Sequence, residues 1–407
     1  MRRDLYGLLI ALALGGCQLD REPVREPQVR DSAGVRILTS TLPSGEASRW
    51  TLSSTPVLSI GAAEGSEEQL LYRVYAAVAL ENGEILVSNS GSSEVRTYAR
   101  DGNLSRSFGR EGAGPGEFGS FSSMRLYLFA RDSLAVTDER NLRLNIFSTA
   151  GVFDRSIRFA VVEGYGRPTV GGVFSDGQWL IETPQGSGVL QGDVGERLDT
   201  WWGFFRHAPD GASATHLIDV EGRPRIVNSL GGGAIHYPFV PLTPDPVFAV
   251  LGNDLLVGSG AEPELLRVDS AGRVRSIMRW NQSRTQVREV WDRFASEFLA
   301  EVPEDRKPAY ARLLAMDGLP IPDAVPAIEG LLVDRQGTIW VQEYRLPWQA
   351  SRVWQVLSAD GAWLGQVTTP PRTTVLDIGL DYLLGRQVDD AGVEHIVVYA
   401  LNRERAS

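Results

Sequence analysis

The sequence predicts an all-β protein, a six-bladed β-propeller built from four-stranded antiparallel blades. Two observations carry this prediction: a β-rich unit recurs along the chain, and glycine marks a hairpin at the same place in each copy. In the clearest copy, residues 76–109, Asn82-Gly83 and Asp101-Gly102 each separate two β-prone runs, which is typical of a tight hairpin. The chain of 407 residues also holds 43 glycines and 22 prolines, as a fold with many turns requires.

Six copies of the unit follow one another. Their third-to-fourth strand hairpins align on Gly102, Gly151, Gly211, Gly272, Gly361 and Gly392. A single four-stranded blade cannot bury both of its faces, so the copies must stack around an axis and the ring must close. The last copy is short by one strand. A β-rich run at 49–60 precedes the first full copy, and we predict that it supplies the outer strand of the last blade.

One junction between copies is rich in glycine. Residues 108–118 read FGREGAGPGEF, in which glycine permits a positive φ and proline fixes its own φ, as a compact connection between blades needs. This resembles the G-x-G-P-G-x-F connection of NHL-type propellers, matched by Gly112, Gly114, Pro115, Gly116 and Phe118. The resemblance implies that Phe118 packs between two blades, and residues 61–70 look like a degenerate copy. The chain as a whole most resembles the largely uncharacterised six-bladed propeller lipoproteins and secreted proteins of bacteria.

Residues 283–318 break the β pattern before the fifth blade. Val287, Val290, Trp291 and Phe294 stand at helical spacing, so we expect a helical insertion there. Its apolar face has to be covered by another surface. Two interpretations stay open: the insertion packs on a face of the propeller, or it forms a lid or a partner-binding arm.

The N-terminus has the pattern of a lipoprotein signal peptide. Two arginines precede an apolar run, 5–14, which is too short to span a bilayer, and the run ends in Leu14-Gly15-Gly16-Cys17. This resembles a bacterial lipobox, which implies cleavage after residue 16 and lipidation of Cys17. We expect a flexible tether at 17–35, the propeller at 36–403 and a tail at 404–407. Gln18, in place of Asp, favours an outer membrane facing the periplasm, with the cell surface as a second location.

Composition excludes some classes of function. The formal net charge of −11 repels phosphate backbones, so nucleic acid is not an expected partner. Cys17 is the single cysteine, so no internal disulfide can form. The sequence carries none of the standard catalytic motifs for a nucleophilic serine, a zinc protease or a phosphate-binding loop.

Polar residues end the second strand of several copies, chiefly Asn89, Asp138 and Glu343. Oxygen ligands of this kind suit Ca²⁺. Gluconolactonase-like propellers hold a divalent cation near their axis with Glu, Asn and Asp, and this resemblance implies a metal-assisted hydrolase or lyase. The other interpretation is that a short polar side chain ends the strand and caps its turn.

Four aromatic residues are candidates for a binding face: Trp201, Trp202, Tyr344 and Trp348. Each fits a core position as well. We favour a non-enzymatic scaffold in the cell envelope that binds a protein, peptide or glycan, because propeller loops on a rigid ring form a good recognition platform. The metal-assisted enzyme is the alternative, and Ca²⁺ is the one cofactor it would need.

Overall fold

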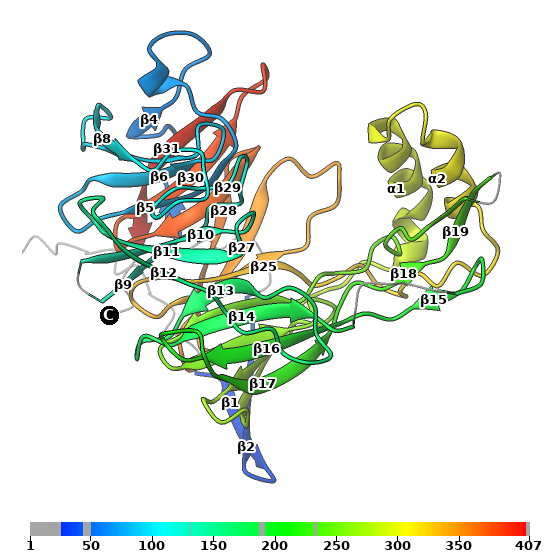
Figure 1. Cartoon of the computed structure of the whole chain (residues 1–407). Helices are drawn as coiled ribbons and strands as arrows, with labels where there is room; N and C mark the ends of the chain where they lie inside the picture. The colour runs from blue at the N-terminus through cyan, green and yellow to red at the C-terminus, as the bar shows by residue number, and fades with distance from the viewer. Residues whose placement is uncertain (1–25, 44–49, 131, 187–191, 232–233, 404–407) are drawn as a thin grey trace, which may run out of the picture.

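The protein is a six-bladed β-propeller with a side lobe (Figure 1). The computed structural model describes residues 26–43, 50–130, 132–186, 192–231 and 234–403. Six antiparallel sheets surround one axis, and the first strands of neighbouring blades contact one another. The predicted fold class is therefore confirmed. The signal peptide, Cys17, Gln18 and the tail lie outside the described residues.

The first five blades each contain four strands in chain order from the axis outward. Blade 1 is β5 (Val74–Ala79), β6 (Ile85–Asn89), β7 (Glu94–Tyr98) and β8 (Leu104–Phe108); blade 2 is β9 (Leu126–Phe129), β10 (Ser133–Asp138), β11 (Arg143–Ser148) and β12 (Phe153–Ile157). Blade 3 is β13 (Thr169–Val173), β14 (Trp179–Pro184), β16 (Trp201–His207) and β17 (Ala214–Glu221); blade 4 is β21 (Val247–Leu251), β22 (Asp254–Gly258), β23 (Glu264–Val268) and β24 (Val274–Trp280). Blade 5 is β25 (Ile328–Val333), β26 (Ile339–Glu343), β27 (Arg352–Leu357) and β28 (Trp363–Thr369).

The sixth blade is shared between the two ends of the chain. The C-terminal part supplies β29 (Thr373–Ile378), β30 (Tyr382–Val388) and β31 (Glu394–Arg403). The outer edge comes from β3 (Trp50–Leu52) and β4 (Leu58–Ile60), which both pair antiparallel with β31. The predicted closure is confirmed, although residue 49 lies outside the described part. One alignment was wrong: Gly392 lies between the second and third strands of its blade, because the fourth strand comes from the N-terminus.

A hairpin of β1 (Gln28–Ser32) and β2 (Val35–Ser40) extends blade 4, where β2 runs parallel to β24. The expected tether at 17–35 therefore includes an ordered strand. This strand could not be predicted from the sequence, because β1 is exposed along its whole length and lacks apolar alternation.

The glycine-rich junction holds blades 1 and 2 together through one buried ring. Phe118 is fully buried between the two blades, with its ring centroid 6.0 Å from that of Phe147. Arg143 donates to the carbonyls of Gly114 at 2.9 Å and Glu117 at 2.6 Å, and so stabilises a connection with little regular strand pairing.

The degenerate copy at 61–70 is built in the same way. It contains the short 3₁₀ helix η1 (Glu67–Gln69). Arg96 donates to the carbonyls of Glu67 at 2.7 Å and Leu70 at 2.9 Å, and Leu71 is buried in the place that Phe118 takes at the next junction.

A second interlock joins blades 5 and 6 next to the closure. The indole rings of Trp50 and Trp340 meet edge to face at 5.4 Å. The Arg403 guanidinium lies 4.7 Å from the Trp50 ring and donates to the buried Asp334 carboxylate at 2.9 Å. That carboxylate also accepts from the Trp340 indole at 3.0 Å. Strands β3 and β31, which pair with each other in blade 6, are thus held to blade 5 by ring packing and by an ion pair.

The side lobe contains the predicted helices, α1 (Val287–Glu301) and α2 (Lys307–Leu314), so the helical insertion is confirmed. It also contains strands from other connections: β15 (Arg197–Leu198), β18 (Arg225–Ile226), β19 (Asn228–Gly231) and β20 (Ala234–His236). Val287 and Phe294 of α1 pack against Leu242, Val325 and Leu346, which come from three different connections. No helix among the described residues is long and apolar enough to cross a membrane.

Candidate binding face

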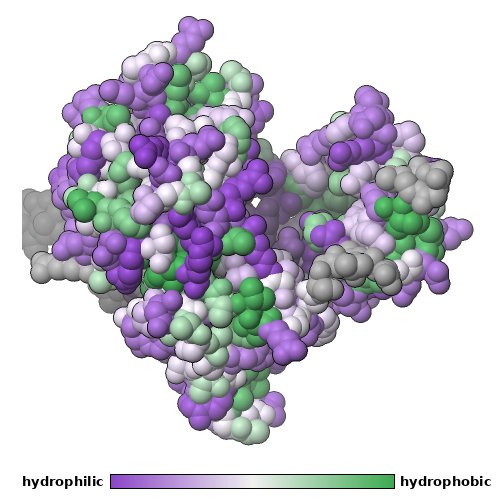
Figure 2. Space-filling model, in the orientation of Figure 1, coloured by the Kyte–Doolittle hydropathy of each residue, from purple (hydrophilic) through white to green (hydrophobic). Residues whose placement is uncertain are grey.

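All the long connections leave the ring on one face, which we call the lobe face. In an antiparallel blade, the link from the second to the third strand and the link to the next blade lie at the same end of the strands. Among the described residues, the lobe is made of parts of four such links: 185–186, 192–200, 222–231 and 234–246 from blade 3, 281–327 from blade 4, and 344–351 within blade 5. In the space-filling view the lobe stands off the ring with a notch between them (Figure 2).

A cavity of about 390 Å³ opens on this face at blades 2 to 4, and we call it the mouth cavity. Its lining consists of Arg125, Glu139, Thr169, Glu182, Trp202, Phe204, Asp245, Pro246 and Phe248. Arg125 of blade 2 pairs with Glu182 of blade 3 at 3.0 Å and so bridges the two blades. Burial raises the pKa of Glu182, and Arg125 opposes that shift. Burial also disfavours the charged guanidinium, but the neighbouring Tyr127 and Glu182 raise the pKa of Arg125, which stays protonated.

The mouth cavity carries an excess of negative charge. Glu139 and Asp245 line it in addition to the paired Glu182, and neither makes an ion pair with another described residue. Three carboxylates thus face one guanidinium. In a partly enclosed site such charges act more strongly than in water, so the cavity favours a positively charged group.

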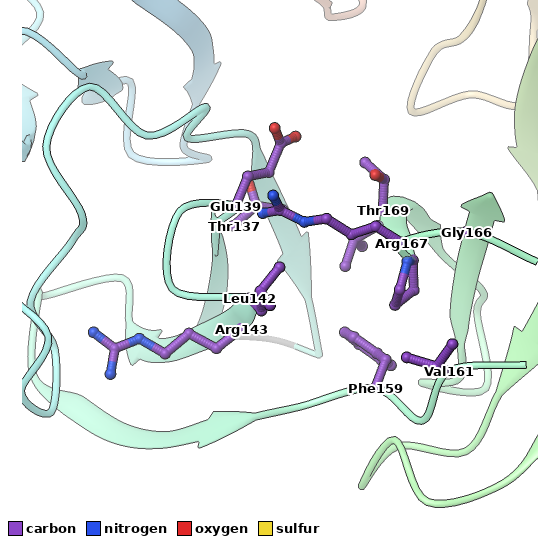
Figure 3. Close-up of a pocket in the computed structure, with 11 residues that line it drawn as sticks. Thr137, Glu139, Leu142, Arg143, Phe159, Val161, Gly166, Arg167 and Thr169 are labelled. Carbon is purple, nitrogen blue, oxygen red and sulfur yellow. The ribbon is translucent and has the colours of Figure 1, made fainter. Parts of the chain in front are cut away.

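An apolar pocket of about 280 Å³ adjoins the mouth cavity, and the two share Glu139 and Thr169 (Figure 3). Leu142, Phe159 and Val161 form its apolar wall, and the Arg167 side chain extends toward Glu139 at the boundary with the mouth cavity. The Arg143 side chain points away from it, as its bonds to the glycine-rich junction require. An apolar pocket that opens into a negatively charged cavity can take a ligand with one apolar and one basic group.

The structure places the three predicted channel-mouth residues in separate blades, and each is hydrogen-bonded locally. Asn89 accepts from the Tyr72 amide at 2.8 Å. Asp138 accepts from the Gly119 amide at 3.0 Å and pairs with Arg143 at 3.1 Å.

Glu343 accepts from the Gln355 side chain at 2.7 Å, again within its own blade. No three or more His, Cys, Asp or Glu side chains in the described part are grouped as a metal site would need. Asn89 and Asp138 also bind Ser92 and Asn141 in the turns that follow their strands, as the capping interpretation predicts, whereas Glu343 binds only across to the neighbouring strand among the contacts of the described residues.

The four predicted aromatic residues divide between two regions. Trp202 is half-buried and lines the mouth cavity, while Trp201 is exposed at the start of β16. Tyr344 and Trp348 pack instead against the apolar cluster of the lobe, and Arg293 lies over the Trp348 ring at 4.3 Å. The structure therefore brings only Trp202 to the mouth cavity.

The charged residues of the mouth cavity were missed in the sequence. One signal was present: arginine stands directly before the first strand of blades 1, 2 and 6, at Arg73, Arg125 and Arg372. A charged residue repeated at the start of an inner strand points to the rim of the channel. Nothing in the sequence pairs Arg125 with Glu182, which lies 57 positions away.

The fold and this face define a six-bladed propeller with an added lobe. Among solved structures, the chain is similar to a DUF4221 family member from Bacteroides vulgatus, with 11% identity over 88% of this chain and 100% of that chain, and a TM-score of 0.52. It is also similar to an exported protein from Bacteroides fragilis (12% identity, 91% and 100% covered, TM-score 0.48). A third similar structure is the calcium-binding protein regucalcin from Agrobacterium tumefaciens (13% identity, 87% and 96% covered, TM-score 0.40).

At these identities the likeness concerns the fold alone. No protein-family model matches the chain, and the comparison with curated proteins gives no match.

Proposed function

We propose that this chain is a lipid-anchored scaffold of the cell envelope that binds a peptide or protein segment without catalysis. The observation that carries the proposal is the apolar pocket that opens into the negatively charged mouth cavity on the lobe face. The ligand presents an apolar side chain beside a lysine or arginine. A glycan fits less well, because sugar hydroxyls against Leu142, Phe159 and Val161 would lose hydrogen bonds to water.

The two halves of this site supply different parts of the affinity. Burial of one aliphatic side chain in the apolar pocket contributes about 1.5–3 kcal/mol. The carboxylates of Glu139 and Asp245, which form no ion pair with another described residue, attract the basic group and disfavour acidic peptides, so they set specificity. Leu142 lies in the β10–β11 link, and Phe159 and Val161 lie in the connection between blades 2 and 3, so ordering of these side chains on binding lowers the net affinity.

Fluorescence polarisation with short labelled peptides tests this proposal. We expect a peptide with a Leu-Lys pair to bind more tightly than the same peptide with Leu-Glu. Glu139→Gln and Val161→Ser should each weaken the Leu-Lys peptide about tenfold, the equivalent of about 1.4 kcal/mol. Glu81→Gln is the matched control, because this exposed residue lies in the β5–β6 hairpin on the opposite face. Equal binding of both peptides, or unchanged binding by both variants, would rule the proposal out.

The anchor is tested separately. Cys17→Ala removes the acyl acceptor, so we expect the protein to leave the membrane pellet for the soluble fraction on cell fractionation. A variant that remains in the pellet would argue against lipidation at this position.

A further inference from the structure

A second charged cavity lies between the lobe and blades 5 and 6. It has a volume of about 560 Å³ and we call it the arginine cleft. Its lining consists of Glu301 at the end of α1, Arg345, Pro347, Trp348, Gln349, Ala350 and Arg352 of blade 5, and Pro371, Arg372, Thr374 and Val388 of blade 6. Three guanidinium groups therefore face one carboxylate, in a protein whose formal net charge is −11.

Two of these guanidinium groups lack counterions within the described part of the chain. Arg345 and Arg352 are both half-buried, and neither forms an ion pair with a carboxylate of the described residues. Burial lowers the pKa of Arg352. Glu329 opposes this shift, but the positive charges of Arg345 and Arg386 lower the pKa further. Like charges that are held together and partly removed from water carry a free-energy cost, which an anion in the cleft would offset.

The two groups are also held in place. Arg345 donates to the Gln349 carbonyl at 2.7 Å, and Arg352 donates to the Thr373 carbonyl at 2.9 Å. The Gln349 side chain in turn accepts from the Leu346 amide at 2.7 Å, which fixes the loop that carries Arg345. Each guanidinium has five N–H donors in a planar fork, so most remain available after these contacts. A fork of this kind suits the paired oxygens of a carboxylate or phosphate.

We propose that the arginine cleft is an oxyanion site that binds a small ligand through a carboxylate or phosphate group, with Arg345 and Arg352 as the binding residues and Arg372 at its rim. Lysine would neutralise the anion as a point charge, whereas two arginines fix its orientation. This site is separate from the mouth cavity, which carries the opposite charge, and the proposal does not depend on peptide binding there.

Calorimetric titration of the full chain at low ionic strength tests this site, with glucuronate, inorganic phosphate and uncharged glucose as probes. We expect glucuronate or phosphate to bind and glucose not to bind. Binding of glucuronate alone identifies a carboxylate ligand, and binding of phosphate alone identifies a phosphorylated one. Added salt should weaken the interaction, because the groups are only partly buried.

Arg345→Gln should raise the Kd of the anion at least about tenfold, because the charge-assisted hydrogen bonds of the guanidinium are lost. Arg352→Gln should do the same, and its melting temperature without ligand shows whether the lost bond to Thr373 has disturbed the fold. Arg155→Gln, an exposed arginine on blade 2, makes the same change in charge as a matched control. The proposal is overturned if neither anion binds at millimolar concentration, or if Arg155→Gln weakens binding as much as Arg345→Gln.

Discussion

The ring and the side lobe are held together in different ways. In the ring, large apolar clusters span neighbouring blades; one of them joins Leu86 and Val95 of blade 1 to Leu126 and Leu134 of blade 2. In the lobe, the two clusters have few fully buried members, and many of their aromatic residues are only partly buried. Blade packing is therefore cooperative around the whole ring, whereas the lobe can open locally while the ring stays folded.

This difference fits the distribution of the candidate sites. The mouth cavity is lined mostly by residues in or beside the strands of blades 2 to 4, with Asp245 and Pro246 at the end of a lobe link. One wall of the arginine cleft includes Glu301 at the end of α1, the C-terminal end of a lobe helix. Small movements of the lobe would change the width of this cleft.

Removal of the strands that close the ring should have the largest effect on the stability of the protein. Deletion of residues 50–60 removes β3 and β4, exposes the edge of β31 and leaves the Arg403–Asp334 pair without the Trp50 ring. We expect loss of the folded monomer and aggregation through the open edge. Size-exclusion chromatography with circular dichroism measures this. A truncated protein that remains monomeric with an unchanged melting temperature would refute the role of this closure.

The next largest effect on stability is expected when one buried aromatic side chain is removed from the propeller or from the lobe. Phe118→Ala removes a fully buried side chain between blades 1 and 2, so we expect the free energy of unfolding to fall by about 3–5 kcal/mol. Thermal or denaturant unfolding of the whole protein measures it.

Phe294→Ala in α1 is the matched lobe variant. It should lower the hydrogen-exchange protection of residues 287–314 while the main unfolding transition of the ring shifts little. If both variants lowered the main transition equally, the ring and the lobe would have to be one cooperative unit.

The same contrast explains how much was predictable from sequence. The ring repeats one unit, so glycine hairpins such as those at Gly102 and Gly151 and the junction at Phe118 expose its period and its closure. Gly392 was placed one hairpin too far along because the last blade borrows its outer strand. The lobe has no period: the apolar face of α1 was visible, but its partners Leu242 and Leu346 come from connections far away in the chain. The ion pair between Arg125 and Glu182 in the mouth cavity likewise joins residues that are far apart in the sequence.

The smallest expected effect is on the pH dependence of stability, which should differ between the propeller and the lobe. Burial opposes ionisation of Asp269 in blade 4, but the amides of Arg273 and Ala271 and the Arg273 side chain lower the pKa of its carboxyl to about 2. Since this pKa lies below the usual value near 4, ionised Asp269 stabilises the fold above about pH 4, and that contribution is lost as the pH falls toward 2.

Asp269→Asn should therefore lower stability at neutral pH by about 1 kcal/mol, allowing for solvent screening, and flatten the decline between pH 4 and 2. Glu304→Gln in the lobe is the control, because its pair with Lys307 is exposed and should contribute almost nothing. Melting temperatures across this pH range decide the matter: parallel curves for the wild type and Asp269→Asn would show that the turn carboxylate does not contribute to the acid sensitivity of the ring.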